Sequence, residues 1–388
     1  DRAIASQKII EAYLKQNQTE NAIIIFDKMG AGHFKRLARL EIIRTYLKLD
    51  QIDKAIAIFD ETKEWDDKNE ASLEFIEVYL KQNQIDKALP LYFKMKEEPL
   101  KDSARLKIIE AYLKQNQIEN AITIFDKMNE GVYKDIARNN FIKAYLKQNQ
   151  IDKAVALFHE MKKNSLKEGP GLKIIRVYLK QNQIENAITI FDKIKEGHYK
   201  SIAREEFIKV YLKQNQIDKA ISIFDEMEEE PLKDHTRLDF IKVYLKQNKI
   251  DKAITIFDEM QEGPVKDSAR LDFIEVYLKQ NKIDKSVTVF DKMQEGDFKR
   301  LAREAFIEAY LKQNQIDKAI TVFDEMKEDD NALAGLKIIE AYNKLNQTEN
   351  AAIIFGRIKN GFERFLIEFQ ASGLDEELAR LLNGATEK

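Results

Sequence analysis

Residues 104–128 read ARLKIIEAYLKQNQIENAITIFDKM, and this stretch decides the fold. Apolar residues recur at helical spacing before Gln115, and they recur again at i, i+3, i+4 and i+7 after Gln117. Between the two runs stands Asn116, a residue type that tolerates the left-handed conformation in which many helices end. The stretch therefore predicts two helices of about a dozen residues each, joined by a tight turn.

The same pattern returns along the chain at intervals of 33 residues, with a last interval of 32. Each copy is centred on a tyrosine, which is position 0 of the register used below: Tyr13, Tyr46, Tyr79, Tyr112, Tyr145, Tyr178, Tyr211, Tyr244, Tyr277, Tyr310 and Tyr342. Such an interval is typical of stacked repeats, in which each unit buries its apolar surface against its neighbours. We predict an all-α protein, an α-solenoid of stacked helix-turn-helix repeats forming a right-handed superhelix. Eleven repeats would occupy residues 1–358, and capping helices would occupy residues 359–388.

Composition narrows the function classes. The 388 residues include 64 Lys and Arg against 67 Asp and Glu, a net charge of -3, with four His and no Cys. No apolar run approaches the roughly 20 residues that cross a bilayer, so we predict no membrane partner. Carboxylates recur in every unit, as structural residues do, and we predict no catalytic residue, no metal, no cofactor and no small-molecule substrate. The compartment stays open: a cytoplasmic protein is the default, and a secreted effector is an alternative. The chain begins at Asp1 rather than Met, which fits a fragment of a longer protein.

Residues 111–128 resemble the helix-turn-helix of the tetratricopeptide repeat, with Tyr112, Ala121 and Phe125 at that family's Tyr, Ala and Phe positions. The neighbouring segments IIEAY and FDKM or FDEM resemble the pentatricopeptide repeat still more, and the branch stays open. The resemblance covers roughly residues 3–358. It implies that a ligand binds along the first, inner helix of each unit.

On a helical wheel, the first helix of each unit is apolar except for a narrow stripe at positions -5, -2 and +2. Position +2 is Lys in every unit, whereas -2 is mostly acidic toward the ends and basic in the middle of the array. We predict a partner-binding groove at the central units, formed by Lys143, Lys147, Arg176, Lys180, Lys209, Lys213, Lys242 and Lys246. The alternative is that carboxylates at position -5, Glu206 and Asp239, pair with these cations and that nothing binds there.

Two binding functions remain. The first hypothesis is a non-enzymatic protein-interaction scaffold that holds an extended or helical, acidic protein or peptide segment in this groove. The alternative is single-stranded RNA binding of the pentatricopeptide type, and we disfavour RNA as a partner for two reasons. The resemblance implies that position -6 reads the bases, but Leu106 and its equivalents there are mostly leucine, which cannot hydrogen-bond a base edge. A net charge of -3 also lacks the basic excess expected for phosphate binding.

A second ladder consists of arginines at position -7, such as Arg105 and Arg138. These positions lie within the apolar arc, in the first turn of the helix. We expect each guanidinium to bond a carboxylate at a helix end, such as Asp126 or Asp258, because Arg suits partly buried bidentate pairs.

Overall fold

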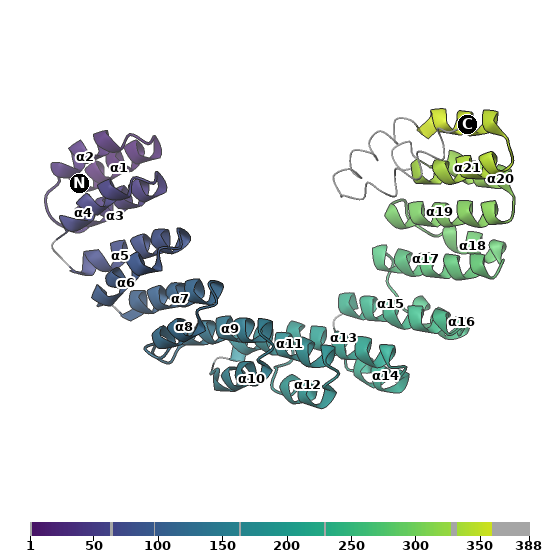
Figure 1. Ribbon diagram of the computed structural model, residues 1–388, viewed down its shortest axis with the longest axis horizontal. Helices are drawn as coiled ribbons and strands as arrows, with labels where there is room; N and C mark the ends of the chain where they lie inside the picture. The colour runs from purple at the N-terminus through teal and green to yellow at the C-terminus, as the bar shows by residue number, and fades with distance from the viewer. Residues whose placement is uncertain are drawn as a thin grey trace. The chain divides into compact units, whose positions relative to one another are not determined.

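A computed structural model shows that the protein is an all-α solenoid, as predicted (Figure 1). It describes residues 2–62, 65–96, 98–162, 164–228, 230–326 and 332–358. Within these ranges the regular structure is helical throughout and contains no strand. The predicted capping helices at 359–388 lie outside the described residues. The right-handed course of the superhelix and the number of repeats stay predictions.

The chain divides between Ala203 and Arg204 into two compact units, which we describe separately. Long and short helices alternate in the first unit: α1 (Arg2–Lys15), α2 (Thr19–Asp27), α3 (His33–Lys48), α4 (Ile52–Asp60), α5 (Trp65–Lys81), α6 (Ile85–Lys94), α7 (Glu98–Lys114), α8 (Ile118–Phe125), α9 (Val132–Lys147), α10 (Ile151–Glu160), α11 (Asn164–Lys180) and α12 (Ile184–Phe191).

The division falls within α13 (His198–Lys213). The alternation continues in the second unit, whose remaining helices are α14 (Ile217–Asp225), α15 (Glu230–Lys246), α16 (Ile250–Asp258), α17 (Pro264–Lys279), α18 (Ile283–Phe290), α19 (Asp297–Lys312), α20 (Ile316–Asp324), α21 (Ala332–Lys344) and a further helical stretch at 348–358.

The turn inside each repeat is set by an asparagine, or by Asp50 in the repeat of Tyr46. Asn116 has φ of 60°, and the equivalent residues of the other repeats have φ between 56° and 60°. The amide of Asn116 donates to the carbonyl of Leu113 at 3.1 Å, and that of Gln117 donates to the carbonyl of Tyr112 at 2.9 Å. This pair of bonds is the Schellman arrangement, which satisfies carbonyls that a helix end leaves free. The second helix therefore starts at a fixed angle to the first.

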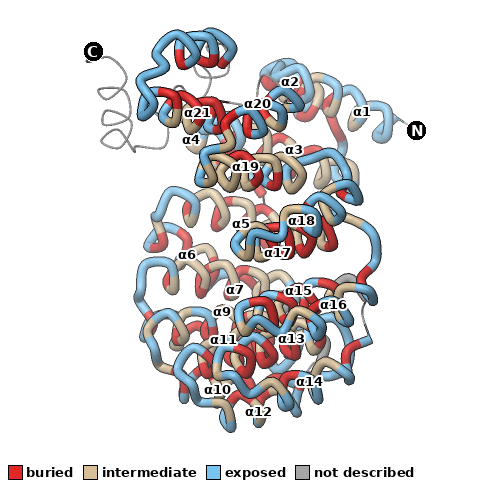
Figure 2. The backbone as a smooth tube through the Cα atoms, turned by 90° about the vertical axis from the view of Figure 1, so that its right-hand side faces the viewer, coloured by how far each residue is buried: buried red, intermediate tan, exposed pale blue. Residues whose placement is uncertain are grey.

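In each unit, buried residues lie along the faces where neighbouring helices meet (Figure 2). In one repeat Ile108 and Ile109 of α7 are fully buried together with Ala121 of α8, whose small side chain lets the two helices approach closely. Between repeats, the ring of Phe125 on α8 meets the edge of Phe141 on α9, with centroids 5.2 Å apart. Each repeat thus completes the apolar surface of the next, as the sequence period requires.

The arginines at position -7 are buried, but their partners differ from those expected. Arg138 Nη1 lies 2.8 Å from Asp135 Oδ1 on the same helix, and Nη2 lies 2.9 Å from Glu130 Oε1 just before that helix. Neither Asp126 nor Asp258 has this role in the pairs that the structure records; the same i, i+3 pairing recurs as Asp102–Arg105, Asp234–Arg237 and Asp267–Arg270. The guanidinium of Arg138 also hydrogen-bonds Glu130 so strongly that the pKa of Glu130 falls to about 2.

Candidate functional site

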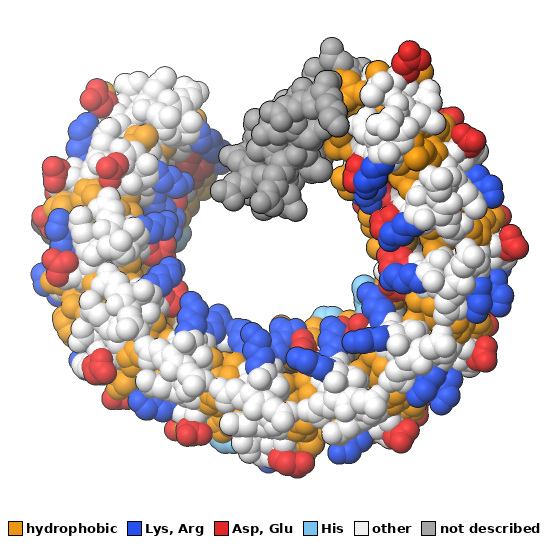
Figure 3. Space-filling view, turned by 45° about the vertical axis from the view of Figure 1, so that its right-hand side comes forward, with side chains coloured by type: hydrophobic (Ala, Val, Ile, Leu, Met, Phe, Trp, Pro, Cys, Tyr) orange, Lys and Arg blue, Asp and Glu red, His pale blue; other side chains and the backbone are white. Residues whose placement is uncertain are grey.

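The predicted groove residues all lie exposed on first helices, at the stripe that the helical wheel defines. They fall into both compact units, so they form two patches that we treat separately. In the first unit Lys143 and Lys147 lie on α9, and Arg176 and Lys180 lie on α11, which packs against α9. In the second unit the patch consists of Lys209, Lys213, Lys242 and Lys246 on α13 and α15. Lys and Arg side chains gather visibly on the face shown in Figure 3.

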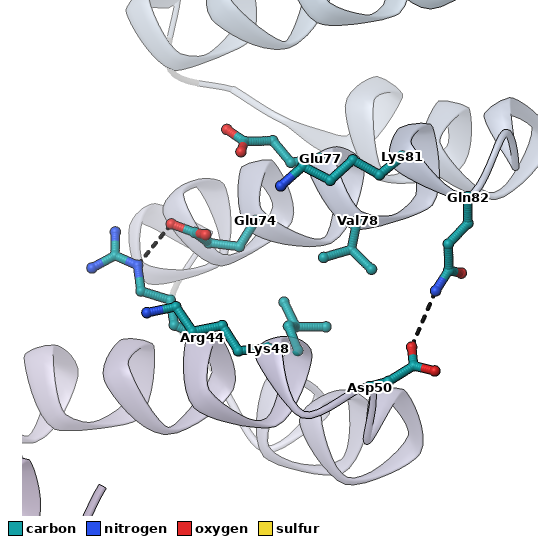
Figure 4. Close-up of a pocket in the computed structure, with 9 residues that line it drawn as sticks. Arg44, Lys48, Asp50, Glu74, Glu77, Val78, Lys81 and Gln82 are labelled. Atoms are coloured by element: carbon teal, nitrogen blue, oxygen red, sulfur yellow. Dashed lines mark hydrogen bonds and ion pairs between the residues drawn. The ribbon is translucent and has the colours of Figure 1, made fainter. Parts of the chain in front are cut away.

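Stripe residues also interact across neighbouring helices in a regular way. Position -2 of one repeat meets position -5 of the next, about one repeat further along the chain. We call each such pair a rung. Arg44 Nε on α3 lies 2.7 Å from Glu74 Oε1 on α5 (Figure 4). The next rung has the opposite polarity: Lys107 Nζ on α7 lies 3.0 Å from Glu77 Oε1 on α5. These two rungs therefore neutralise charge between helices.

The rung that follows is polar rather than ionic, because Asn140 Nδ2 on α9 donates to Glu110 Oε1 on α7 at 2.9 Å. The next one, between α9 and α11, breaks the pattern, since both members are cations: Lys143 at -2 and Lys173 at -5. Burial lowers the pKa of Lys173, and the charge of Lys143 lowers it further. The first unit therefore contains one rung at which two ammonium groups repel each other.

In the second unit, basic residues at -2 face carboxylates instead. Lys209 lies near Asp239 of α15 and bonds Glu205 on its own helix. Burial raises the pKa of Asp239, while the charge of Lys209 opposes that rise. The carboxyl of Asp272 on α17 is more strongly affected: burial raises its pKa to about 6 against the opposing charge of Lys242.

Near the carboxyl end of the described chain, the lysines at +2 pair with glutamates at -2. Lys279 Nζ lies 3.6 Å from Glu275 Oε2, and Lys312 Nζ lies 2.8 Å from Glu308 Oε1. These i, i+4 pairs partly neutralise that stripe. The central repeats carry Lys or Arg at -2, so the lysines at +2 there have no such partner one turn earlier.

A pocket between α3 and α5 shows how the stripe is shaped. Arg44, Lys48, Glu74, Glu77 and Lys81 line it together with Val78 and Gln82 (Figure 4). An equivalent pocket lies between α17 and α19, where Glu275, Lys279, Glu308 and Lys312 take part in its lining. Neighbouring first helices therefore leave a recess between them whose walls are the residues at -2 and +2.

Where position -6 is leucine, it does not line this surface, whereas Glu205 at the same position bonds Lys209 of the stripe. Leu40, Leu172 and Leu238 are buried at that position, and Leu106 is partly buried. These leucines pack between helices, so they are not placed to read a base, and their apolar character is no argument against RNA. Polar residues one place later, at -5, also reach the stripe, as Lys107 and Asn140 do.

Within the ranges that the structure describes, no three or more His, Asp or Glu side chains are grouped as a metal ion requires. Among the same residues, no helix combines the length and the apolar character needed to span a bilayer.

Comparison with known families identifies the repeats. Residues 96–194 match the family model described as pentatricopeptide repeat-containing protein. The model of the pentatricopeptide repeat itself matches four successive stretches, at 207–232, 240–264, 273–298 and 305–331. No curated protein matches the chain.

Solved structures with similar architecture include the pentatricopeptide repeat protein PPR10 from maize, at 14% identity and a TM-score of 0.45. PPR10 in complex with an 18-nt psaJ RNA element matches at 12% identity and a TM-score of 0.43. Each alignment covers 98% of this chain but only 64% and 65% of PPR10, so the chain spans less than two thirds of that protein's length. Aspartyl phosphate phosphatase F from Bacillus subtilis matches at 14% identity over 93% of this chain and 94% of its own, with a TM-score of 0.31. These TM-scores are too low to support a function.

The pentatricopeptide matches overturn two expectations from the sequence. The hypothesis of a scaffold for an acidic protein or peptide is wrong, and so is the view that RNA is a disfavoured partner. Both objections to RNA had physical flaws. The leucines at position -6 are packing residues, and the net charge of -3 is an average over a surface on which Lys and Arg are gathered along the stripe.

Proposed function

Because the chain belongs to the tetratricopeptide and pentatricopeptide-like superfamily of helical repeats, we propose that it binds single-stranded RNA along the stripes of its first helices. The observation that carries this proposal is the run of four successive pentatricopeptide repeat matches between residues 207 and 331. A fifth match to a pentatricopeptide family model covers residues 96–194. Both compact units therefore contain repeats of this type.

The stripe offers the two kinds of group that RNA binding needs. Exposed lysines at +2, such as Lys114, Lys147 and Lys213, supply positive charge for phosphates in each unit. Polar groups at -5 and the recesses between first helices supply hydrogen-bonding partners for unstacked bases, which are the usual targets of RNA recognition. The eight residues predicted from the sequence are the cations that we propose to contact the backbone. We propose binding without catalysis, because these groups are arranged as a repeated surface rather than as one convergent cluster.

The direct test is a binding assay with fluorescent single-stranded RNA of about 20 nucleotides and random sequence, a size suited to several repeats. Matched single-stranded DNA and double-stranded RNA serve as competitors, and the salt concentration is varied. We expect single-stranded RNA to bind preferentially. The logarithm of the affinity should fall linearly with the logarithm of salt, with a slope of about -0.7 for each phosphate contacted.

The variant Lys147→Glu with Lys180→Glu should weaken this binding by about tenfold or more, since it reverses two charges on the stripe. The matched control is Lys193→Glu with Lys195→Glu, because these exposed lysines follow α12 and lie outside the stripe. If the two double variants bind RNA equally well, the stripe is not part of the RNA interface. Absence of RNA binding by the parent at low salt would overturn the proposed function itself.

A further inference from the structure

One rung between first helices presents two cations, and this arrangement points to a ligand. In the first unit Arg44 pairs with Glu74, Lys107 pairs with Glu77, and Asn140 bonds Glu110. The following rung presents two ammonium groups, from Lys143 on α9 and Lys173 on α11. Like charges on neighbouring elements destabilise the fold, so this rung has an electrostatic cost that its neighbours avoid.

Nothing in the described part of the chain offsets that cost. No carboxylate there forms an ion pair with Lys143 or with Lys173. Lys173 is half-buried, and both burial and the charge of Lys143 disfavour its protonated form. Lys147 adds a third, exposed ammonium one turn along α9. The rung is therefore a place where an external anion would be favourable.

We propose that Lys143 and Lys173 form a phosphate subsite, at which one phosphodiester of the bound RNA is held between α9 and α11. This inference rests on the proposed function. A phosphodiester carries a single negative charge on two non-bridging oxygens, and each oxygen can accept a hydrogen bond from one of the two lysines. The anion occupies the position that a carboxylate occupies in the other rungs, and it removes the repulsion between the helices.

The second unit shows why the subsite belongs to this rung. Lys209 there faces Asp239, and Lys242 faces Asp272. A phosphate at either place would meet a carboxylate together with the lysine, so the attraction would be largely cancelled. The lysines at +2 occur in every repeat and provide a uniform positive surface, whereas the pair of Lys143 and Lys173 provides a fixed point. It would hold the RNA backbone independently of base sequence.

The test uses Lys173→Glu, which converts the rung into an ionic pair with the polarity of Arg44 and Glu74. This variant should fold, and it should unfold at a higher temperature than the parent because it exchanges repulsion for attraction. Lys143→Glu creates the same pair with reversed polarity. Lys193→Glu is the control for an equal change in net charge outside the stripe.

We expect each rung variant to bind single-stranded RNA about tenfold more weakly than Lys193→Glu, irrespective of RNA sequence. The slope of log affinity against log salt should become shallower by about 0.7, which corresponds to one lost phosphate contact. The proposal is overturned if the rung variants match Lys193→Glu in both affinity and slope while the parent binds RNA.

A second measurement separates this result from failure of the proposed function. Inorganic phosphate and tripolyphosphate are added to the parent and to Lys173→Glu, and the unfolding temperature is recorded. If the parent binds no RNA but is stabilised by these anions more than the variant is, the rung binds phosphate from another source and only the RNA function fails. If the parent binds no RNA and phosphate stabilises both proteins equally, both proposals fail.

Discussion

Gln181 donates a hydrogen bond from Nε2 to Oδ1 of Asn149, 2.8 Å away, and thereby joins the turns of two successive repeats. Asn149 is also the residue that ends α9 in the left-handed conformation, with φ of 58°. The same bond recurs at 2.5 to 3.1 Å as Gln82–Asp50, Gln148–Asn116, Gln247–Asn215, Gln280–Asn248 and Gln313–Asn281. One side chain thus combines a backbone role with a contact between repeats.

The two roles of Asn149 can be separated by mutation. Gln181→Ala removes only an exposed hydrogen bond and should cost at most about 0.5 kcal/mol. Asn149→Ala loses the same hydrogen bond. Alanine also lacks the polar side chain that helps asparagine to tolerate the left-handed conformation, so the loss of stability should be about 1 kcal/mol larger. Asn149→Gly should recover most of this second loss. Urea unfolding of the three variants measures the order, and an Asn149→Ala variant as stable as Gln181→Ala would contradict it.

The buried pair of Asp135 and Arg138 should matter more than any rung. Asp135 accepts from the guanidinium and also from the amide of Lys162, at 3.2 Å, so it ties the start of α9 to the end of α10. Asp135→Ala leaves a buried cation with one partner fewer and should cost about 3 kcal/mol. The control is Asp152→Ala, an exposed carboxylate in the first turn of α10, for which about 0.5 kcal/mol is expected. Equal losses in the two variants would show that the pair is not specifically stabilising.

Much of this architecture could be predicted from the sequence because it is local and repeated. The interval of 33 residues implied stacked helix pairs. Asn116 implied a left-handed turn between the two helices of its repeat, and the structure has that turn. Partners across helices were harder to predict. The sequence placed Arg138 against a carboxylate but not against Asp135, because a helix first turn offers several acidic groups within reach.

For the candidate site, the exposed positions could be predicted from the sequence, but the contacts between helices could not. The wheel placed Lys143 and Lys147 on an exposed stripe, but it could not say which residue of the next helix each would face. That depends on the lateral offset between first helices, which only the packed structure fixes. The error over position -6 has the same origin, since Leu106 and Lys107 are adjacent in the sequence and packing decides which one is covered.

Loss of a core ring should act locally in a solenoid. Phe141 is fully buried on α9 and meets Phe125 of the preceding repeat. Phe141→Ala should cost about 3 to 5 kcal/mol. Each repeat contacts only its neighbours, so hydrogen exchange should accelerate first in α8, α9 and α10. An equal loss of protection in α1 and in α9 would show that the first unit unfolds as a single cooperative body.

Asp272 should make the stability of the second unit depend on pH in the opposite sense to an ion-paired carboxylate. Its pKa is about 6 in the folded protein, because burial disfavours the charged form, against a usual value of 3.8. One of its carboxylate oxygens, Oδ2, is buried without a hydrogen-bond partner. The charged groups that act on it are Lys242 of α15 and Glu275 and Lys279 of its own helix. The folded state therefore holds the proton more tightly than the unfolded chain does.

It follows that the contribution of Asp272 to stability is present below about pH 4 and is lost as the pH rises to about 6 and above. Asp272→Asn removes this dependence. The variant should equal the parent near pH 4 and exceed it by about 1 kcal/mol at neutral pH, a figure reduced from the full shift because solvent still reaches the side chain. Urea unfolding of the parent, of Asp272→Asn and of the exposed control Asp258→Asn at both pH values measures the difference. If the stability of Asp272→Asn relative to the parent rises between the two pH values no more than that of Asp258→Asn does, ionisation of the buried Asp272 carboxyl does not destabilise the fold.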